Sequence, residues 1–118
     1  MIKKTDISLF NSVLLQEFNL KSKPIIRITN RIVFKGELCW GLYIGYTIKK
    51  RNYHTIKVNR AQLLDNLELF CVLAHEYCHA WQLENKLEID HEQSFQQWES
   101  YFNNYYNIDI VLMKDSNA

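Results

Sequence analysis

The chain has 118 residues, with 14 basic and 13 acidic side chains and a formal net charge of +1. This balance excludes a uniformly basic nucleic-acid-binding protein and a polyanionic tail protein. Hydrophobic residues make up 47% of the chain, which has only 3 Gly and 1 Pro, so a disordered or fibrous protein is excluded too. A chain of this length forms one core, and we expect a single domain over residues 1–118.

The N-terminal residues and the cysteine content indicate the cellular compartment in which the protein is expected. Three cysteines without a CxxC pair argue against a disulfide framework and favour a reducing interior. Two lysines before apolar residues resemble a signal peptide, but Asp6, Asn11 and Gln16 interrupt the apolar run and no small-residue cleavage site follows. No segment approaches the roughly 20 apolar residues that span a bilayer. We therefore expect a soluble, cytoplasmic protein without a membrane partner.

The charges are divided unevenly along the chain. Residues 1–60 hold 12 basic and 3 acidic side chains, a net +9, whereas residues 61–118 hold 2 basic and 10 acidic side chains, a net −8. A basic N-terminal half of this kind could contact DNA phosphates. The alternatives are lysines that protect sheet edges, and a basic half that docks on the acidic half or on an acidic partner.

The N-terminal segment, about residues 6–19, is predicted to be a helix. Four apolar residues recur at three- and four-residue spacing: Ile7, Phe10, Leu14 and Phe18. Such spacing places them on one helix face. We expect Thr5 or Asp6 to cap the start, and Pro24 to prevent any extension.

Residues 25–58 change to an alternating pattern typical of strands. Short strands are expected around residues 26–28 and 32–34, and strict alternation from Leu38 to Ile48 predicts a long one. Residues 49–52 are predicted to form a turn, followed by a returning strand over Tyr53–Asn59. We expect a small antiparallel sheet of three to four strands.

Two helices are predicted after the sheet, which makes the fold class α+β. The first runs from about Asn66 to Glu84, where Asp65 and Glu68 form a capping-box pattern. The second runs from about Glu92 to Tyr105. Residues 108–113 are expected to form a short strand or coil, and residues 114–118 a frayed end.

The first of these helices carries the sequence His75-Glu76-Tyr77-Cys78-His79, an HExxH motif. Residues four apart lie on one helix face, so both imidazoles can reach one metal ion. Zinc suits such ligands, lowers the pKa of a bound water to about 7 and polarises a carbonyl. Glu76 would then accept the proton of the water as general base. The alternative is that the two histidines merely fill a helix face.

A zinc site of this kind needs a third ligand, for which His91 is preferred. The loop over residues 85–90 is long enough to fold His91 back over the motif. Glu92 and Glu99 are the alternative ligands, since a glutamate from a following helix can complete such a site. His91 or Asp90 could instead cap the next helix. We expect His54 to be a surface or sheet residue.

Several other side chains are candidates for supporting roles. Cys71 and Cys78 share the histidine face and are expected to be buried thiols, with a cysteine-containing structural zinc site as the alternative. Gln82, one turn beyond His79, is expected to orient the site or contact substrate. Tyr101 and Tyr105 could donate to an oxyanion, the alternative being ordinary aromatic core or surface positions.

Residues 38–98 resemble the SprT-like zinc metallopeptidases, the family that includes the DNA–protein crosslink protease Spartan. The resemblance rests on the strand Ile56–Asn59, the segment Leu73–Ala80 and the pair His91 and Phe95. The family usually has glycine after its third histidine, where this chain has Glu92.

The resemblance implies a minimal zincin-like fold, with the N-terminal helix, the small sheet, the HExxH helix and the helix after it. It implies that an edge strand, here Tyr53–Asn59, pairs with extended substrate. In that fold His75, His79 and His91 would bind Zn2+, and Glu76 would be the general base.

We therefore expect a monomeric zinc metallopeptidase that cleaves protein or peptide substrates, including proteins associated with DNA. The alternative is a catalytically silent, zinc-dependent binding or regulatory module of the same fold. The intact Glu76 favours the enzyme, because a purely structural site needs no general base. A zinc-free scaffold is the least favoured.

Overall fold

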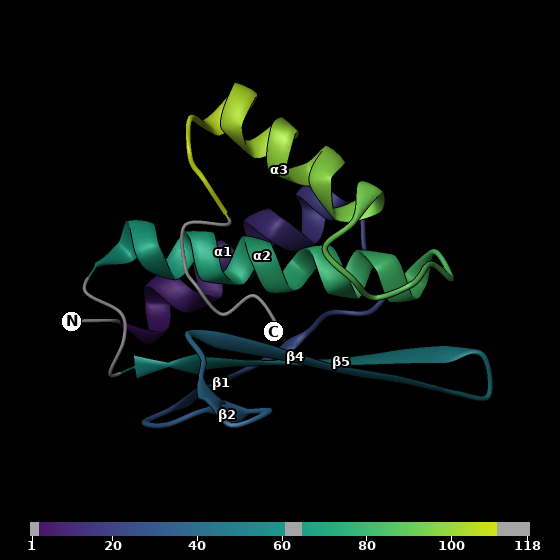
Figure 1. The fold of residues 1–118 in the computed structure, drawn as a ribbon, viewed down its shortest axis with the longest axis horizontal. Helices are drawn as coiled ribbons and strands as arrows, with labels where there is room; N and C mark the ends of the chain where they lie inside the picture. The colour runs from purple at the N-terminus through teal and green to yellow at the C-terminus, as the bar shows by residue number, and fades with distance from the viewer. Residues whose placement is uncertain (1–2, 61–64, 111–118) are drawn as a thin grey trace.

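The computed structural model describes residues 3–60 and 65–110 and confirms the predicted α+β class (Figure 1). Its elements follow in the order α1 (Lys4–Phe18), β1 (Ile25–Thr29), β2 (Val33–Phe34), β3 (Glu37–Leu38), β4 (Gly41–Ile48), β5 (Arg51–Asn59), α2 (Asn66–Glu84) and α3 (Gln93–Tyr106). None of these helices is long and apolar enough to cross a membrane.

The main sheet has the strand order β1-β5-β4, and its pairing is mixed. β4 runs antiparallel to β5, but β1 runs parallel to it, so the prediction of an antiparallel sheet is wrong. The chain passes through the β2–β3 hairpin and β4 before it reaches β5, and this path brings β5 back in the direction of β1. β5 is the central strand. The expectation that Tyr53–Asn59 forms an edge is therefore wrong, and β1 and β4 are the edges.

The strand predicted from Leu38 to Ile48 is broken at Cys39 and Trp40, where the chain passes between the two sheets. The Cys39 amide donates to the Ile32 carbonyl at 2.9 Å, whereas the Trp40 carbonyl accepts from the Asn59 amide at 2.8 Å. Alternation continues through this point, but it does not identify the pairing strand. Nor does it mark a buried face here, because Leu38, Ile44, Tyr46 and Ile48 are all exposed.

The turn between β4 and β5 is shorter than predicted. Lys49 and Lys50 have φ angles of 50° and 67°, as in a two-residue hairpin loop whose twist matches that of the strands. Arg51 and Asn52, which were expected in the turn, instead pair with residues of β4.

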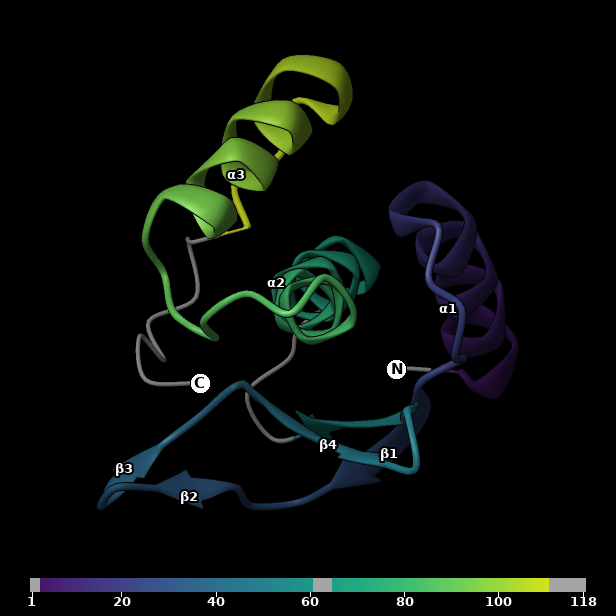
Figure 2. The same cartoon turned by 90° about the vertical axis from the view of Figure 1, so that its right-hand side faces the viewer.

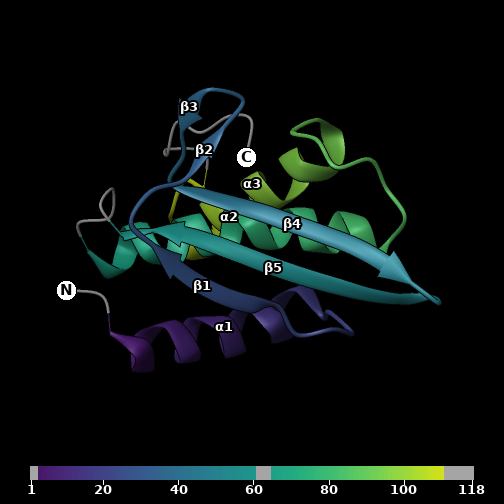
Figure 3. The same cartoon turned by 90° about the horizontal axis from the view of Figure 1, so that it is seen from below.

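The helices lie on one face of the main sheet; α2 lies between that sheet and α3, and α1 lies beside α2 (Figure 2). In the view from below, no helix among the described residues covers the opposite face (Figure 3). Because α2 has neighbours on several sides, every residue from Cys71 to Ala80 is buried. The histidine-bearing face is thus enclosed as well as the apolar one.

The first residues of α1 and α2 can be compared with the capping residues predicted for them. The side chain of Asp65 accepts a hydrogen bond from the Glu68 amide at 2.9 Å, and α2 has the predicted limits. α1 begins before the predicted caps Thr5 and Asp6, at an N-cap, Lys3, without a side-chain hydrogen bond. Residues 108–110 form no strand, and the rest of the predicted tail lies outside the described residues.

Candidate metal centre

Three histidines converge at one place between α2 and the start of α3. His75 and His79 lie on α2, His91 lies just before α3, and one ring nitrogen of each lies within 4.8 Å of the others. The Nε2 atoms of His75 and His91 are 3.2 Å apart. Phe95 packs against all three rings, with centroid distances of 4.8, 5.5 and 4.9 Å. The loop before α3 therefore brings His91 to the HExxH motif, as predicted.

Hydrogen bonding leaves His75 in the form that binds a metal. Its Nδ1 lies 2.9 Å from the Ile110 carbonyl, and since a carbonyl only accepts, Nδ1 carries the proton and Nε2 keeps its lone pair. Burial, the largest cause, and nearby His91 lower the pKa of His75 to about 4, although the hydrogen bond to Ile110 acts in the opposite direction. The His75 imidazole is therefore uncharged at neutral pH, and its Nε2 can donate a lone pair to a metal ion.

His79 is oriented by Gln82, a role that the sequence predicted for this residue. The Gln82 amide nitrogen donates to the Asp90 carbonyl at 3.0 Å and to the Ser94 hydroxyl at 2.8 Å. The amide oxygen consequently faces Nδ1 of His79, at 2.9 Å. His79 therefore donates from Nδ1 and leaves Nε2 available to a metal. Gln82 is fully buried, which favours the predicted orienting role over the alternative of substrate contact.

Replacing Gln82 by alanine is expected to weaken metal binding about 10–100-fold, because a histidine whose second nitrogen has lost its partner is poorly oriented. Competition with a chromophoric chelator, with zinc as the probe, measures this affinity. Gln16→Ala is the matched control, since Gln16 is exposed on α1. An affinity equal to that of the control would contradict the orienting role.

Glu76 lies on the buried part of α2, where α2 meets the edge strand β4, and only 1% of it is exposed. A Cβ atom on Gly41 of β4 would lie 3.0 Å from Glu76 Oε2 and 2.6 Å from Val72 Cγ1. Only glycine lets the strand approach the helix this closely. Our sequence reasoning missed Gly41, although a glycine inside an alternating strand indicates such a close approach.

Gly41→Ala is expected to lower the free energy of unfolding by about 1–3 kcal/mol, because the added methyl group overlaps Val72 in a packed core. Urea unfolding measures the change. In the double variant Gly41→Ala/Val72→Ala, the loss should be smaller than the sum of the two single losses. Additive losses would show that this contact does not determine the spacing of β4 and α2.

A model of the SprT-like family matches residues 8–112, which include the three histidines, Glu76 and Gly41. The chain belongs to the SprT-like family. No curated protein and no solved structure gives a significant match. Family membership agrees with the resemblance seen in the sequence and applies to most of the chain.

The fourth histidine of this SprT-like chain is not part of the histidine cluster. His54 of β5 is buried; its Nδ1 lies 2.7 Å from the Tyr43 hydroxyl and its Nε2 lies 2.8 Å from Glu84 Oε2. The same carboxylate accepts from the backbone amides of Lys21 and Ser22, at 2.7 and 3.0 Å. His54 is therefore a sheet residue, as expected, but it is interior and linked to α2.

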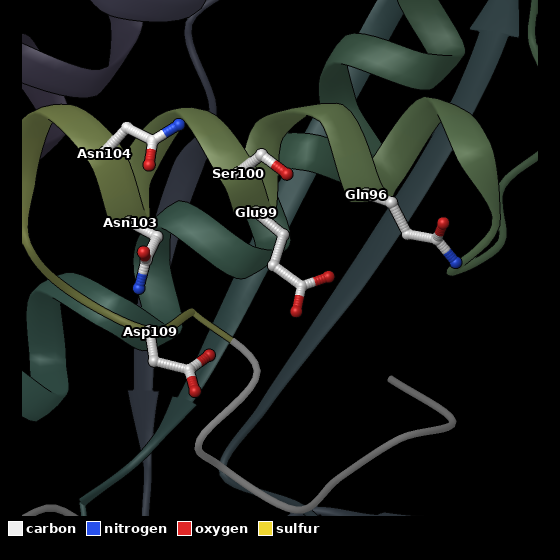
Figure 4. Close-up of a pocket in the computed structure, with 6 residues that line it drawn as sticks. All are labelled: Gln96, Glu99, Ser100, Asn103, Asn104 and Asp109. Carbon is white, nitrogen blue, oxygen red and sulfur yellow. The ribbon is translucent and has the colours of Figure 1, made fainter.

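The two alternative glutamate ligands lie outside the histidine cluster. Among the described residues, the group able to hold a metal contains only the three histidines. Glu92 is the N-cap of α3 and is exposed. Glu99 lines a polar pocket of about 400 Å³, and in Figure 4 its carboxylate and that of Asp109 point into the space between α3 and the segment after it.

The cysteines and tyrosines considered for supporting roles also lie apart from the cluster. Cys71 and Cys78 are free and buried, and neither joins the group of possible ligands among the described residues. Burial is the main cause that raises the pKa of Cys71 to about 11 and that of Cys78 well above its ordinary value. Tyr101 donates to Glu17 of α1, and Tyr105 is 76% exposed.

Proposed function

We propose that this SprT-like protein is a zinc metallopeptidase. The observation that carries the proposal is the convergence of three imidazoles, two of them on the helix that also carries Glu76. The donor set fits zinc, because catalytic zinc sites have three protein ligands of this kind and one open position. When bound, zinc polarises a substrate carbonyl and lowers the pKa of water to about 7.

The residues of the chain would divide the remaining tasks. His75, His79 and His91 hold the metal, and the first two are kept in the required tautomer by Ile110 and Gln82. Glu76 accepts a proton from the attacking water and passes it to the leaving amine. Its burial favours proton transfer inside the site over exchange with solvent.

The strand that would hold the substrate is β4 rather than β5. β4 is an edge of the main sheet, and at Gly41 it approaches Glu76. An extended peptide paired with β4 would be fixed by backbone hydrogen bonds next to the proposed base. This assignment transfers the substrate role predicted for Tyr53–Asn59 to the edge strand that approaches Glu76.

Cleavage of an unfolded protein such as casein tests the proposed activity. We expect cleavage by the zinc-loaded protein, loss of cleavage after removal of zinc with a chelator, and recovery when zinc is added back. Unchanged cleavage in chelator, or failure of the purified protein to take up zinc, would contradict the proposal.

The face of the main sheet that no helix among the described residues covers supports a second proposal, contact with single-stranded nucleic acid. The strands β1, β4 and β5 contain no acidic residue, and basic side chains lie across the sheet at Arg27, Arg51 and Lys57. Tyr46 and Tyr53 stack at 5.2 Å and are 50% and 37% exposed. Basic side chains of this kind contact the phosphate backbone of a nucleic acid, and exposed aromatic rings stack on its bases.

Fluorescence anisotropy with a labelled single-stranded oligonucleotide tests this contact. We expect binding that weakens as salt is raised, and weaker binding after Tyr53→Ala. Tyr105→Ala, at an exposed site on α3, is the control. Equal binding by the two variants would contradict the proposal. Binding of DNA and zinc without cleavage of any protein substrate would instead favour the catalytically silent module.

A further inference from the structure

A second pocket lies among the three helices, and neither proposed function uses it. Its lining residues are Glu17 of α1, Trp81 of α2, and Gln97, Trp98 and Tyr101 of α3, and its volume is about 360 Å³. Figure 2 shows α1 and α3 on either side of α2, and the pocket has lining residues from all three helices. We propose that this aromatic pocket binds the ammonium end of a lysine side chain from a protein partner.

The rings of the aromatic pocket are arranged as adjoining walls. The Trp98 ring lies at 78° to that of Trp81 and at 84° to that of Tyr101, with centroids 5.5 and 5.4 Å away. Trp98 also packs on Phe18 at 4.1 Å, which fixes its position. Walls at nearly right angles allow one cation to meet more than one aromatic surface, and such contacts attract alkylammonium groups.

The acidic side chain beside these rings selects for positive charge. The hydroxyl of Tyr101 donates to the Glu17 carboxylate, which holds the carboxylate at the pocket. Within residues 3–60 and 65–110, no lysine or arginine forms an ion pair with Glu17. The cation–ring contacts in the same part of the chain are at Phe34 and Tyr53. The pocket therefore combines a carboxylate and aromatic faces with no cation from these residues.

The chemistry of the walls favours lysine over other ligands. An anion would be repelled by Glu17, and a purely apolar group would gain nothing from the carboxylate. A lysine has an apolar stem that can lie against the rings, and a terminal charge that can reach Glu17. None of the lining residues belongs to the histidine cluster, so binding can be measured without metal.

Tryptophan fluorescence offers a direct test. The chain has 3 tryptophans, so the variant Trp40→Phe leaves emission from Trp81 and Trp98, both in the pocket. We expect N-acetyl-lysine methylamide to change this emission saturably, and its trimethylated form to bind more tightly. The uncharged norleucine counterpart should give no change. Equal responses to lysine and norleucine, no response to lysine, or tighter binding of the arginine counterpart would overturn the proposal.

Substitutions that leave the tryptophans in place test the role of the carboxylate. Glu17→Gln is expected to weaken lysine binding roughly two- to fivefold, as for other partly exposed charge pairs. Glu37→Gln, which removes an exposed carboxylate on β3, should leave it unchanged. Tyr101→Leu removes one wall and should weaken binding further, provided that thermal unfolding shows the variant to be folded. Unchanged affinity in both Glu17→Gln and Tyr101→Leu would overturn the assignment of the site.

Discussion

Replacing Glu76 by glutamine is expected to lower the rate of peptide cleavage by a factor of about 10²–10⁴, the usual contribution of a general base. Glutamine has nearly the same shape as glutamate, so the contact with β4 at Gly41 is kept. It cannot accept the proton of an attacking water. The value of kcat/KM for a quenched fluorescent peptide measures the loss, and mass spectrometry under native conditions measures the metal that remains bound.

A matched control is Glu99→Gln, because Glu99 belongs to α3 and lines a separate polar pocket. This variant should cleave at nearly the rate of the unmodified protein. If Glu76→Gln retains both its metal and its full rate, Glu76 is not the base. If it loses its metal, the role of Glu76 is in holding the site together, and the proposed division of tasks between Glu76 and the histidines is wrong.

Much of the histidine cluster could be predicted because its geometry is local. The helical period alone places His75 and His79 on one face, and the cap that starts α2 joins Asp65 and Glu68, only three residues apart. His91 required a longer inference, from the length of the loop before α3. Gln82 was found because it lies one turn beyond His79, where its amide could reach the ring.

The arrangement of the sheet could not be predicted because it depends on pairing between distant segments. Alternation identifies a strand, but it does not identify its neighbours, and in β4 the alternating apolar residues Ile44, Tyr46 and Ile48 are exposed. β5 lies between β1 and β4, and the edge near Glu76 is therefore β4. The proximity of Gly41 to Glu76 follows only from this order. The partners of His54 were missed for the same reason, since Glu84 is 30 residues away in sequence.

The largest stability effect is expected at His54, whose replacement by alanine should lower the free energy of unfolding by about 2–4 kcal/mol. Burial, and to a lesser degree Glu84, raise the pKa of Tyr43 above its ordinary value, so the hydroxyl is protonated and donates to Nδ1 of His54. Nε2 then carries the proton and donates to Glu84. The alanine variant leaves the Glu84 side chain, only 6% exposed, without this donor.

Urea unfolding of four variants, Tyr43→Phe, His54→Ala, Glu84→Ala and the double variant Glu84→Ala/His54→Ala, separates the parts of this network. Tyr43→Phe removes only the bond to Nδ1 and should cost about 1 kcal/mol. His54→Ala should cost more, because it also removes a hydrogen bond to a buried carboxylate. Glu84→Ala/His54→Ala should cost less than the sum of its single changes, since the carboxylate that has lost its donor is gone. A loss in His54→Ala no greater than that in Tyr43→Phe would mean that the amides of Lys21 and Ser22 stabilise Glu84 sufficiently by themselves.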